Sequence, residues 1–120
     1  MILDIKSTIT IEDLQNSFHQ KFKGLKIEFY NNPHNVNEGS SLTEQYDGQI
    51  KLEKLLAGDQ ENEIEILPSN TVFEIEDKFK KQLGLNAQIF RRSKDVWLQT
   101  STTDQWTIEV QNQKGINSTK

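Results

Sequence analysis

Seven aromatic and basic side chains are the residues in this sequence best suited to contact a partner. An aromatic ring offers a flat apolar face for stacking, and a neighbouring Arg or Lys adds charge and hydrogen-bond donors. We predict that they form one surface patch, made of Tyr30, Phe90, Arg91, Arg92, Lys94, Trp97 and Trp106. The chemistry expected of such a patch is recognition, not bond making.

Residue patterns that carry catalysis are missing from the sequence. There is no nucleophile elbow, no glycine-rich phosphate loop and no pair of His at metal-binding spacing. The chain has no Cys and only two His, which excludes disulfides, thiolate metal sites and His-rich metal centres. His19 and His34 are predicted to be solvated side chains. We therefore predict no enzyme activity, no cofactor and no bound metal.

Composition indicates one small globular domain. With 120 residues and a mass of 13.9 kDa, the chain is too short for two independent cores. We expect a single domain over residues 1–115 and a disordered tail over residues 116–120. No run of about 18 apolar residues occurs and the N-terminus lacks a signal-peptide pattern, so a cytoplasmic protein without a membrane partner is predicted.

Two stretches of the chain repeat one pattern of caps, apolar positions and glycines. Thr10 and Thr71 each precede an acidic residue three positions later, which predicts a capping box at the start of a helix. Apolar residues then recur at spacings of three, four and four, which places them on one helix face. They are Ile11, Leu14, Phe18 and Phe22 in the first copy and Val72, Ile75, Phe79 and Leu83 in the second. Gly24 and Gly84 are predicted to end the helices in a left-handed conformation.

Short alternating runs flank each predicted helix and are typical of strands. They occupy residues 3–5 and 25–30 in the first copy and residues 64–66 and 85–90 in the second. We therefore expect two strand-helix-strand units, over about residues 2–31 and 63–92. Because both helices carry an apolar stripe with Phe, they should share one core on one face of a single, mostly antiparallel sheet. The predicted fold class is α+β with a ferredoxin-like arrangement.

The segment between the two copies is predicted to hold a loop and a short helix. Residues 31–41 combine Asn, Pro, Gly and Ser, which favours a polar loop. Four apolar residues from Ile50 to Leu56, followed by Gly58, predict about two helical turns at the edge of the domain.

A β-hairpin and a short helix are predicted to complete the chain. The last strand of the second copy should turn at Ser93 and Lys94, in a register that pairs Phe90 with Trp97. Residues 102–106 resemble a helix cap and first turn, and we expect a short C-terminal helix there. The next four residues also alternate, so a strand is the alternative.

Strand alternation places part of the patch on the outer face of the sheet. Neighbouring positions along a strand face opposite sides. Phe29, Ile89 and Leu98 are expected to face the helices. This alternation puts Tyr30, Phe90 and Trp97 on the far face. An apolar surface of this kind needs either a cover or a partner.

Three interpretations of this aromatic face stay open. In the first, the C-terminal segment folds back and lays Trp106 and Ile108 over Phe90 and Trp97. In the second, the face contacts another protein or a second copy of the chain. In the third, it stacks nucleotide bases, but the net charge of −4 and the lack of an RNA-recognition pattern in LNAQIFRR argue against a nucleic-acid partner.

The C-terminal region also resembles a known group of proteins. The run VWLQTSTTDQWTIEVQN, with the preceding GLNAQIFRRS, is similar to the C-terminal half of a family of small uncharacterised bacterial proteins. The spacing from Trp97 to Trp106 is its most recognisable part. The resemblance implies a bacterial cytoplasmic protein and assigns no functional residues.

We predict from these observations a small interaction or assembly module that uses its aromatic sheet face. Its partner would be another protein or a second copy, giving a homodimer. A small-molecule-binding regulatory domain is the alternative, because of the analogy with other ferredoxin-like sheets. Binding of single-stranded nucleic acid is a third possibility.

Overall fold

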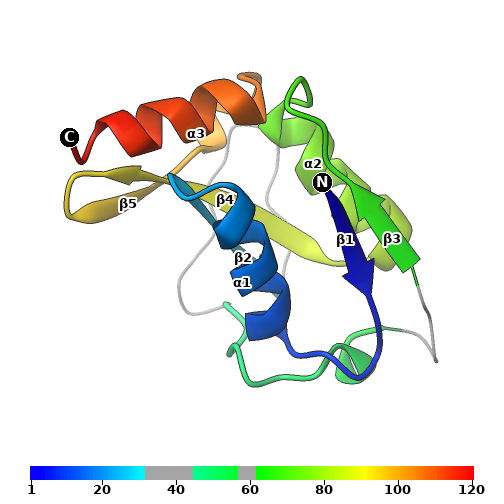
Figure 1. Ribbon diagram of the computed structural model, residues 1–120. Coiled ribbons are helices and arrows are strands. Elements are labelled where there is room, and N and C mark those ends of the chain that lie inside the picture. The colour runs from blue at the N-terminus through cyan, green and yellow to red at the C-terminus, as the bar shows by residue number, and fades with distance from the viewer. Residues whose placement is uncertain (32–44, 57–61) are drawn as a thin grey trace.

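The computed structural model describes residues 1–31, 45–56 and 62–120. Within these residues the chain is an α+β protein with three α-helices and two small antiparallel sheets (Figure 1). The strands are β1 (Ile2–Ile5), β2 (Leu25–Tyr30), β3 (Asn62–Glu65), β4 (Asn86–Ser93) and β5 (Val96–Gln99). The helices are α1 (Ile11–Lys21), α2 (Val72–Leu83) and α3 (Ile108–Asn117), with single 3₁₀ turns at Leu52–Lys54 and Ser101–Thr103.

The predicted repeat is present, but the prediction of one ferredoxin-like sheet is wrong. Each copy forms a strand, a helix and a strand, β1-α1-β2 and β3-α2-β4. Equivalent strands of the two copies pair with each other, in two separate sheets with the orders β1-β3 and β2-β4-β5. The β1–β3 pair and the β2–β4 pair are both antiparallel. Strand alternation could identify the strands, but it does not show which strand lies beside which.

The apolar stripes of both helices face a common core, as predicted. All eight predicted stripe residues are buried. The Phe18 ring packs 5.3 Å from that of Phe22, and the Phe79 ring packs 5.2 Å from that of Phe29 in β2. Leu3 of β1 joins the same cluster, so the two-stranded sheet shares this core. Burial of this apolar surface is the main force that holds the two copies together.

The two repeat helices begin alike and end differently. Thr10 and Thr71 form the predicted capping boxes, in which each hydroxyl accepts a hydrogen bond from the N–H three residues later and the acidic side chain there accepts one from the threonine N–H. Gly84 has φ 68° and ends α2 in the left-handed conformation, as predicted. The same prediction is wrong for Gly24, because α1 ends at Phe22 and Gly24 has no positive φ.

Gly24 is instead a contact point for α3. A Cβ atom on Gly24 or on Gly115 would overlap backbone atoms of the other segment, so both positions need glycine for close approach. The Gly24 N–H also donates a hydrogen bond of 2.8 Å to Asn112 Oδ1 in α3. These contacts hold α3 against the start of β2.

The C-terminal helix was predicted correctly, but it begins later than expected. Residues 101–103 form a 3₁₀ turn, and Thr107 is the N-cap of α3, with its hydroxyl accepting from the Val110 N–H. Ile108 follows at once and is fully buried. The helix therefore starts where its first apolar residue can reach the core.

The tail that was predicted over residues 116–120 begins inside α3. Helix α3 continues to Asn117. The hydroxyl oxygen of Ser118 then lies 3.0 Å from the Arg92 carbonyl oxygen and 3.2 Å from the Lys94 nitrogen. These contacts hold the end of the helix against the β4–β5 hairpin.

The segment between the copies is only partly described. The predicted loop falls outside the described residues except for Asn31, and Gly58 and His34 also lie outside them. The predicted two-turn helix is a single 3₁₀ turn at Leu52–Lys54. Leu52 is buried there and anchors the turn to the core.

Candidate functional site

The β4–β5 hairpin carries most of the predicted patch, in a register that differs from the expected one. Its two-residue turn is Lys94 and Asp95, one residue later than predicted. Trp97 consequently pairs with Arg92 instead of Phe90. Because the pairing is displaced by two positions and side chains alternate with a period of two, Trp97 and Phe90 still share a face of the sheet.

Three of the predicted site residues meet on the outer face of the three-stranded sheet, together with a lysine that sequence reasoning missed. We call Lys26, Phe90, Arg92 and Trp97 the Trp97 face. The Lys26 Nζ lies 5.0 Å from the Phe90 ring centroid and 5.4 Å from that of Trp97, and the Arg92 Cζ lies 5.4 Å from the Trp97 centroid. Two cations therefore flank the indole at cation–π distances.

The Trp97 face is more cationic than aromatic at its surface. Phe90 is buried and Trp97 is half-buried. The Lys26 ammonium forms a salt bridge of 3.4 Å with Glu28. Arg92 has no salt bridge within the described parts of the chain, and its Nε donates to the Lys94 carbonyl at 2.6 Å. Charge is therefore the dominant property of the exposed part of this face.

Tyr30 belongs to the interior and not to the surface patch. It shares the strand face of Phe90 but is only 1% exposed, and it pairs with Asn86 near the far end of the sheet. Burial raises the pKa of the Tyr30 phenol above its usual range, and the Glu28 carboxylate raises it further. Tyr30 therefore cannot contact a partner in this conformation.

Arg91 and Trp106 form a separate contact on the opposite face of the sheet. The Arg91 Cζ lies 5.6 Å from the Trp106 ring centroid, and its Nη1 donates to Gln111 Oε1 of α3 at 2.9 Å. The Lys114 ammonium lies 5.3 Å from the same ring centroid. The predicted residues therefore do not form one patch, because adjacent residues of a strand such as Arg91 and Arg92 point in opposite directions. Lys94 lies in the hairpin turn, on neither face.

This placement shows that the C-terminal segment does not cover the aromatic face, contrary to the first of our interpretations. Trp106 stacks on Arg91, on the side of the sheet opposite Phe90. Ile108 lies in the core. Among the described residues, the Lys26 ammonium lies over the Phe90 ring, 5.0 Å from its centroid.

Strand β5 has two exposed apolar side chains on the face opposite Trp97. Val96 is 54% exposed and Leu98 is 42% exposed. We expected Leu98 to be covered by the helices, because it alternates with Trp97. It does point to that side and pairs with Arg91, but β5 is the outer strand of its sheet and lies beyond the cover that α1 and α2 give to β2 and β4.

A small hollow of about 230 Å³ lies beside Trp97, between α1 and β2. Its lining residues are Gln15, Asn16, His19, Lys26, Ile27, Glu28 and Trp97. His19 is exposed, as predicted, but its Nδ1–H donates to the Leu25 carbonyl at 2.7 Å and its ring lies 6.2 Å from that of Trp97. Binding sites for drug-sized ligands usually measure about 300–1,000 Å³, so this hollow is small for one.

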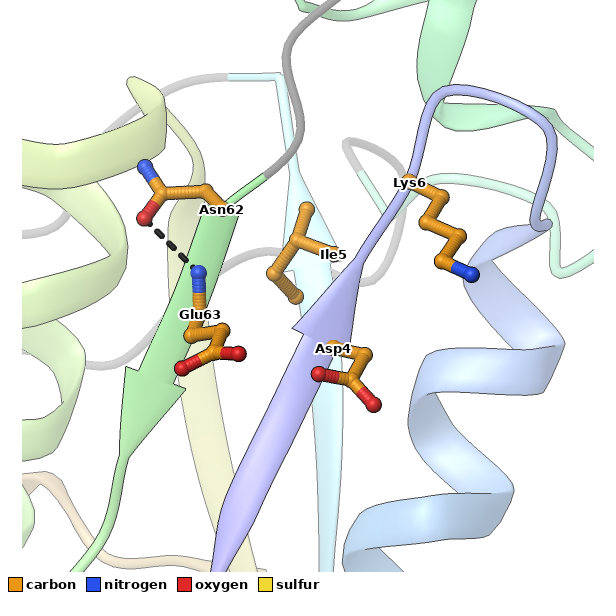
Figure 2. Close-up of a pocket in the computed structure, with 5 residues that line it drawn as sticks. All are labelled: Asp4, Ile5, Lys6, Asn62 and Glu63. Atoms are coloured by element: carbon orange, nitrogen blue, oxygen red, sulfur yellow. Dashed lines mark hydrogen bonds between the residues drawn. The ribbon is translucent and has the colours of Figure 1, made fainter.

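A larger hollow of about 490 Å³ lies at the two-stranded sheet (Figure 2). Asp4 of β1 and Glu63 of β3 pair across it, and Lys6 and Asn62 also line it. Figure 2 shows the two carboxylates on neighbouring strands. In the described part of the chain, no three His, Cys, Asp or Glu side chains are grouped as a metal ion would require. Two carboxylates at an open edge do not make a binding site by themselves.

Glu76 of α2 is a buried acid that sequence reasoning did not identify. It is 7% exposed, and its Oε2 accepts a hydrogen bond of 2.9 Å from the Ile89 N–H. Burial raises the pKa of Glu76 to about 8, against the lowering effect of the Ile89 hydrogen bond, and the Asp104 carboxylate raises it further. Perturbed acids are common at active sites. Glu76 lines neither hollow, and we interpret it as a structural contact between α2 and β4.

Comparison with known proteins assigns the chain to no group. No family model, curated protein or solved structure matches it. The resemblance to small bacterial proteins therefore stays a prediction. Within the described residues no helix is both long enough and apolar enough to cross a lipid bilayer. The function has to be argued from the surface of the molecule.

Proposed function

We propose that the protein is a small protein-interaction module whose binding surface is centred on β5. The observation that carries this proposal is the combination found on one outer strand. Trp97 lies between two cations on one side of it, and Val96 and Leu98 are exposed on the other. Aromatic residues and Arg are enriched in the centres of protein interfaces, and exposed apolar side chains that lie together commonly mark a partner site.

The surroundings of β5 are basic although the whole chain is acidic. The net charge is −4, yet the region from residue 86 onward has more basic than acidic side chains. They are Arg91, Arg92, Lys94, Lys114 and Lys120 against Asp95, Asp104 and Glu109. A partner with negative charge would be attracted to this end of the molecule, with an association rate that falls as salt rises.

The geometry favours a protein over the other two predicted classes of partner. Bases stack on open aromatic faces, whereas the Trp97 ring is flanked by Lys26 and Arg92. A small-molecule site should be a deep and mostly apolar pocket. The hollow beside Trp97 is small, at about 230 Å³, and the hollow of about 490 Å³ at β1 and β3 is lined mainly by polar and charged side chains. The exposed Val96 and Leu98 match the apolar contacts that protein interfaces bury.

The proposal predicts that partner binding depends on β5 and not on exposed apolar residues elsewhere. Leu98 and Leu67 provide a matched pair, since they are 42% and 43% exposed and only Leu98 lies in β5. The wild type and the Leu67→Ala variant should both capture the partner from an extract of the native host. The Leu98→Ala and Trp97→Ala variants should fail to capture it. Calorimetry with the purified partner then measures the loss.

Light scattering of the purified protein would show whether the partner is a second copy. An interaction that survives Trp97→Ala and Leu98→Ala at full strength would place the binding surface elsewhere and refute the proposal.

A further inference from the structure

We infer that the partner binds through a segment that combines acidic and apolar side chains, and that this segment lies across both β5 and α3. The inference rests on the proposed function and specifies the chemistry of the partner. It extends the binding surface from Val96 and Leu98 of β5 onto the C-terminal helix.

Exposed apolar side chains gather at the end of the molecule where α3 lies against the β4–β5 hairpin (Figure 1). Among the described residues, six large apolar side chains are at least 39% exposed, and four of the six are at this end. These four are Val96, Leu98, Trp106 and Val110. Exposed apolar side chains grouped in this way commonly mark a partner site.

Two basic side chains join the apolar ones into one surface. Leu98 pairs with Arg91 across β5 and β4. The Arg91 Cζ and the Lys114 Nζ lie 5.6 and 5.3 Å from the Trp106 ring centroid. Val110 is four residues before Lys114 in α3, so the two share a face of the helix. We call the whole set the α3–β5 surface, made of Arg91, Val96, Leu98, Trp106, Val110 and Lys114.

The charged members of the α3–β5 surface are both cations. Within the described residues, neither Arg91 nor Lys114 forms a salt bridge. Arg91 donates instead to the neutral amide oxygen of Gln111. A carboxylate from a partner would form charge-assisted hydrogen bonds with these cations, and apolar side chains beside it would cover Trp106 and Val110. The expected partner segment is therefore both acidic and apolar.

The length of α3 is a feature of the second copy alone. In each copy, the first N–H of the repeat helix donates to a carbonyl of a later segment, that of Ile50 or Trp106, at 2.9 or 3.0 Å. Two residues further on, Leu52 or Ile108 is fully buried and begins a helix. The first copy makes a single 3₁₀ turn there, whereas the second makes α3. The buried anchor therefore does not require a long helix, and the added turns place Lys114 beside Trp106.

Charge argues for a different protein and against a second copy of this chain. Two copies that met through this surface would each contribute Arg91 and Lys114, so positive charge would face positive charge. Glu109 is the one acid in α3, but it is five residues from Lys114 and lies toward another side of the helix. Complementary interfaces bring opposite charges together, and an acidic segment supplies the missing sign.

A library of random peptides displayed on phage, selected on the immobilised protein, is a direct probe of this chemistry. The selected peptides should be enriched in Asp and Glu together with apolar residues. Fluorescence anisotropy of a labelled selected peptide should show binding that weakens as salt rises. The same peptide with Asn and Gln in place of Asp and Glu should bind at least about tenfold more weakly.

Two lysine variants separate the local charge from the overall charge. Lys114→Gln and Lys80→Gln each remove one positive charge at an exposed position, but only Lys114 belongs to the α3–β5 surface. Lys114→Gln should bind the selected peptide at least about threefold more weakly than the wild type. Lys80→Gln should bind it as the wild type does.

Val110→Glu and Leu67→Glu test the apolar contact in the same way. Val110 and Leu67 are 44% and 43% exposed, so each variant replaces an equally exposed apolar side chain by an acid. Val110 is three residues after the N-cap Thr107, so Glu at this position completes a capping box and keeps α3 stable. Val110→Glu should bind the selected peptide at least about tenfold more weakly than Leu67→Glu. Circular dichroism and thermal unfolding check that both variants fold.

The outcomes separate this inference from the proposed function. A library without a binding peptide, selected peptides without acidic enrichment, or equal binding by the two lysine variants would overturn the acidic partner. Equal binding by Val110→Glu and Leu67→Glu would place the contact away from α3 and overturn the extended surface. In each of these cases, loss of the native partner with Leu98→Ala and Trp97→Ala would still support the proposed function.

Two further results would count against a different part of the argument. Capture of the native partner at full strength by Leu98→Ala and Trp97→Ala would refute the proposed function, even with peptides bound at the α3–β5 surface. Tighter binding of a single-stranded oligodeoxynucleotide than of the selected peptide would overturn the protein segment and replace it by a nucleic acid.

Discussion

Replacing Glu76 by Gln should remove most of the pH dependence that this buried acid gives to the stability of the fold. Glu76 accepts a hydrogen bond from the Ile89 N–H where α2 packs against β4. A Gln side chain has nearly the same shape and keeps an oxygen acceptor, but it cannot ionise. The substitution therefore isolates the cost of charging this group.

The sign of the effect follows from the direction of the pKa change. Folding raises the pKa of Glu76 from 4.5 to about 8, chiefly through burial. Between these pH values the native state binds more protons than the unfolded state, so the free energy of unfolding decreases as pH rises. One pKa unit corresponds to about 1.4 kcal/mol, which sets an upper bound of about 5 kcal/mol for this acid. Because a buried charge is relieved by relaxation and water penetration, we expect a loss of about 2–3 kcal/mol.

Urea denaturation of the wild type and of Glu76→Gln, at about pH 5 and about pH 9, measures this effect. Titration of the other groups is common to both proteins and cancels in the difference. The wild type should lose stability relative to the variant by about 2–3 kcal/mol between the two pH values. Glu53→Gln, at an exposed position, is the control and should follow the wild type. Parallel pH profiles for the wild type and Glu76→Gln would refute our account of the buried acid.

Three further substitutions test the core, a helix cap and the docking of α3. Phe79→Ala should destabilise the protein by about 3–5 kcal/mol in chemical denaturation, because the Phe79 ring is fully buried and packs on Phe29. A loss below about 1 kcal/mol would contradict this and would mean that the neighbouring side chains fill the cavity. Thr71→Ala should cost about 1 kcal/mol, whereas Thr71→Ser should retain the cap. Gly115→Ala should lower stability by about 1–3 kcal/mol in thermal or urea unfolding, because its methyl group would overlap the Gly24 backbone; wild-type stability would contradict the close approach.

Local elements of the fold could be predicted from local sequence. The capping boxes at Thr10 and Thr71 and the buried faces of α1 and α2 depend on residues only a few positions apart. Gly84 ends its helix as predicted for the same reason. The prediction for Gly24 failed because its conformation depends on α3, which approaches from the far end of the chain.

The candidate site was predictable in part. Alternation correctly placed Phe90 and Trp97 on one face, even though the turn lay one residue later than expected. The same alternation also separates Arg91 from Arg92, a signal that was present in the sequence. Lys26 could not be found, because no local pattern shows that β2 lies beside β4.

The sequence by itself determined the repeated strand-helix-strand unit and the buried side of each repeat helix through its periodicity, and the starts of the two helices through their capping residues. Only the tertiary structure decided that like strands of the two copies pair in separate antiparallel sheets, that Glu76 is buried, and that β5 is an outer strand of its sheet. The physical reason is that periodicity reports which side of an element avoids water, whereas strand partners and edges depend on how whole surfaces pack together.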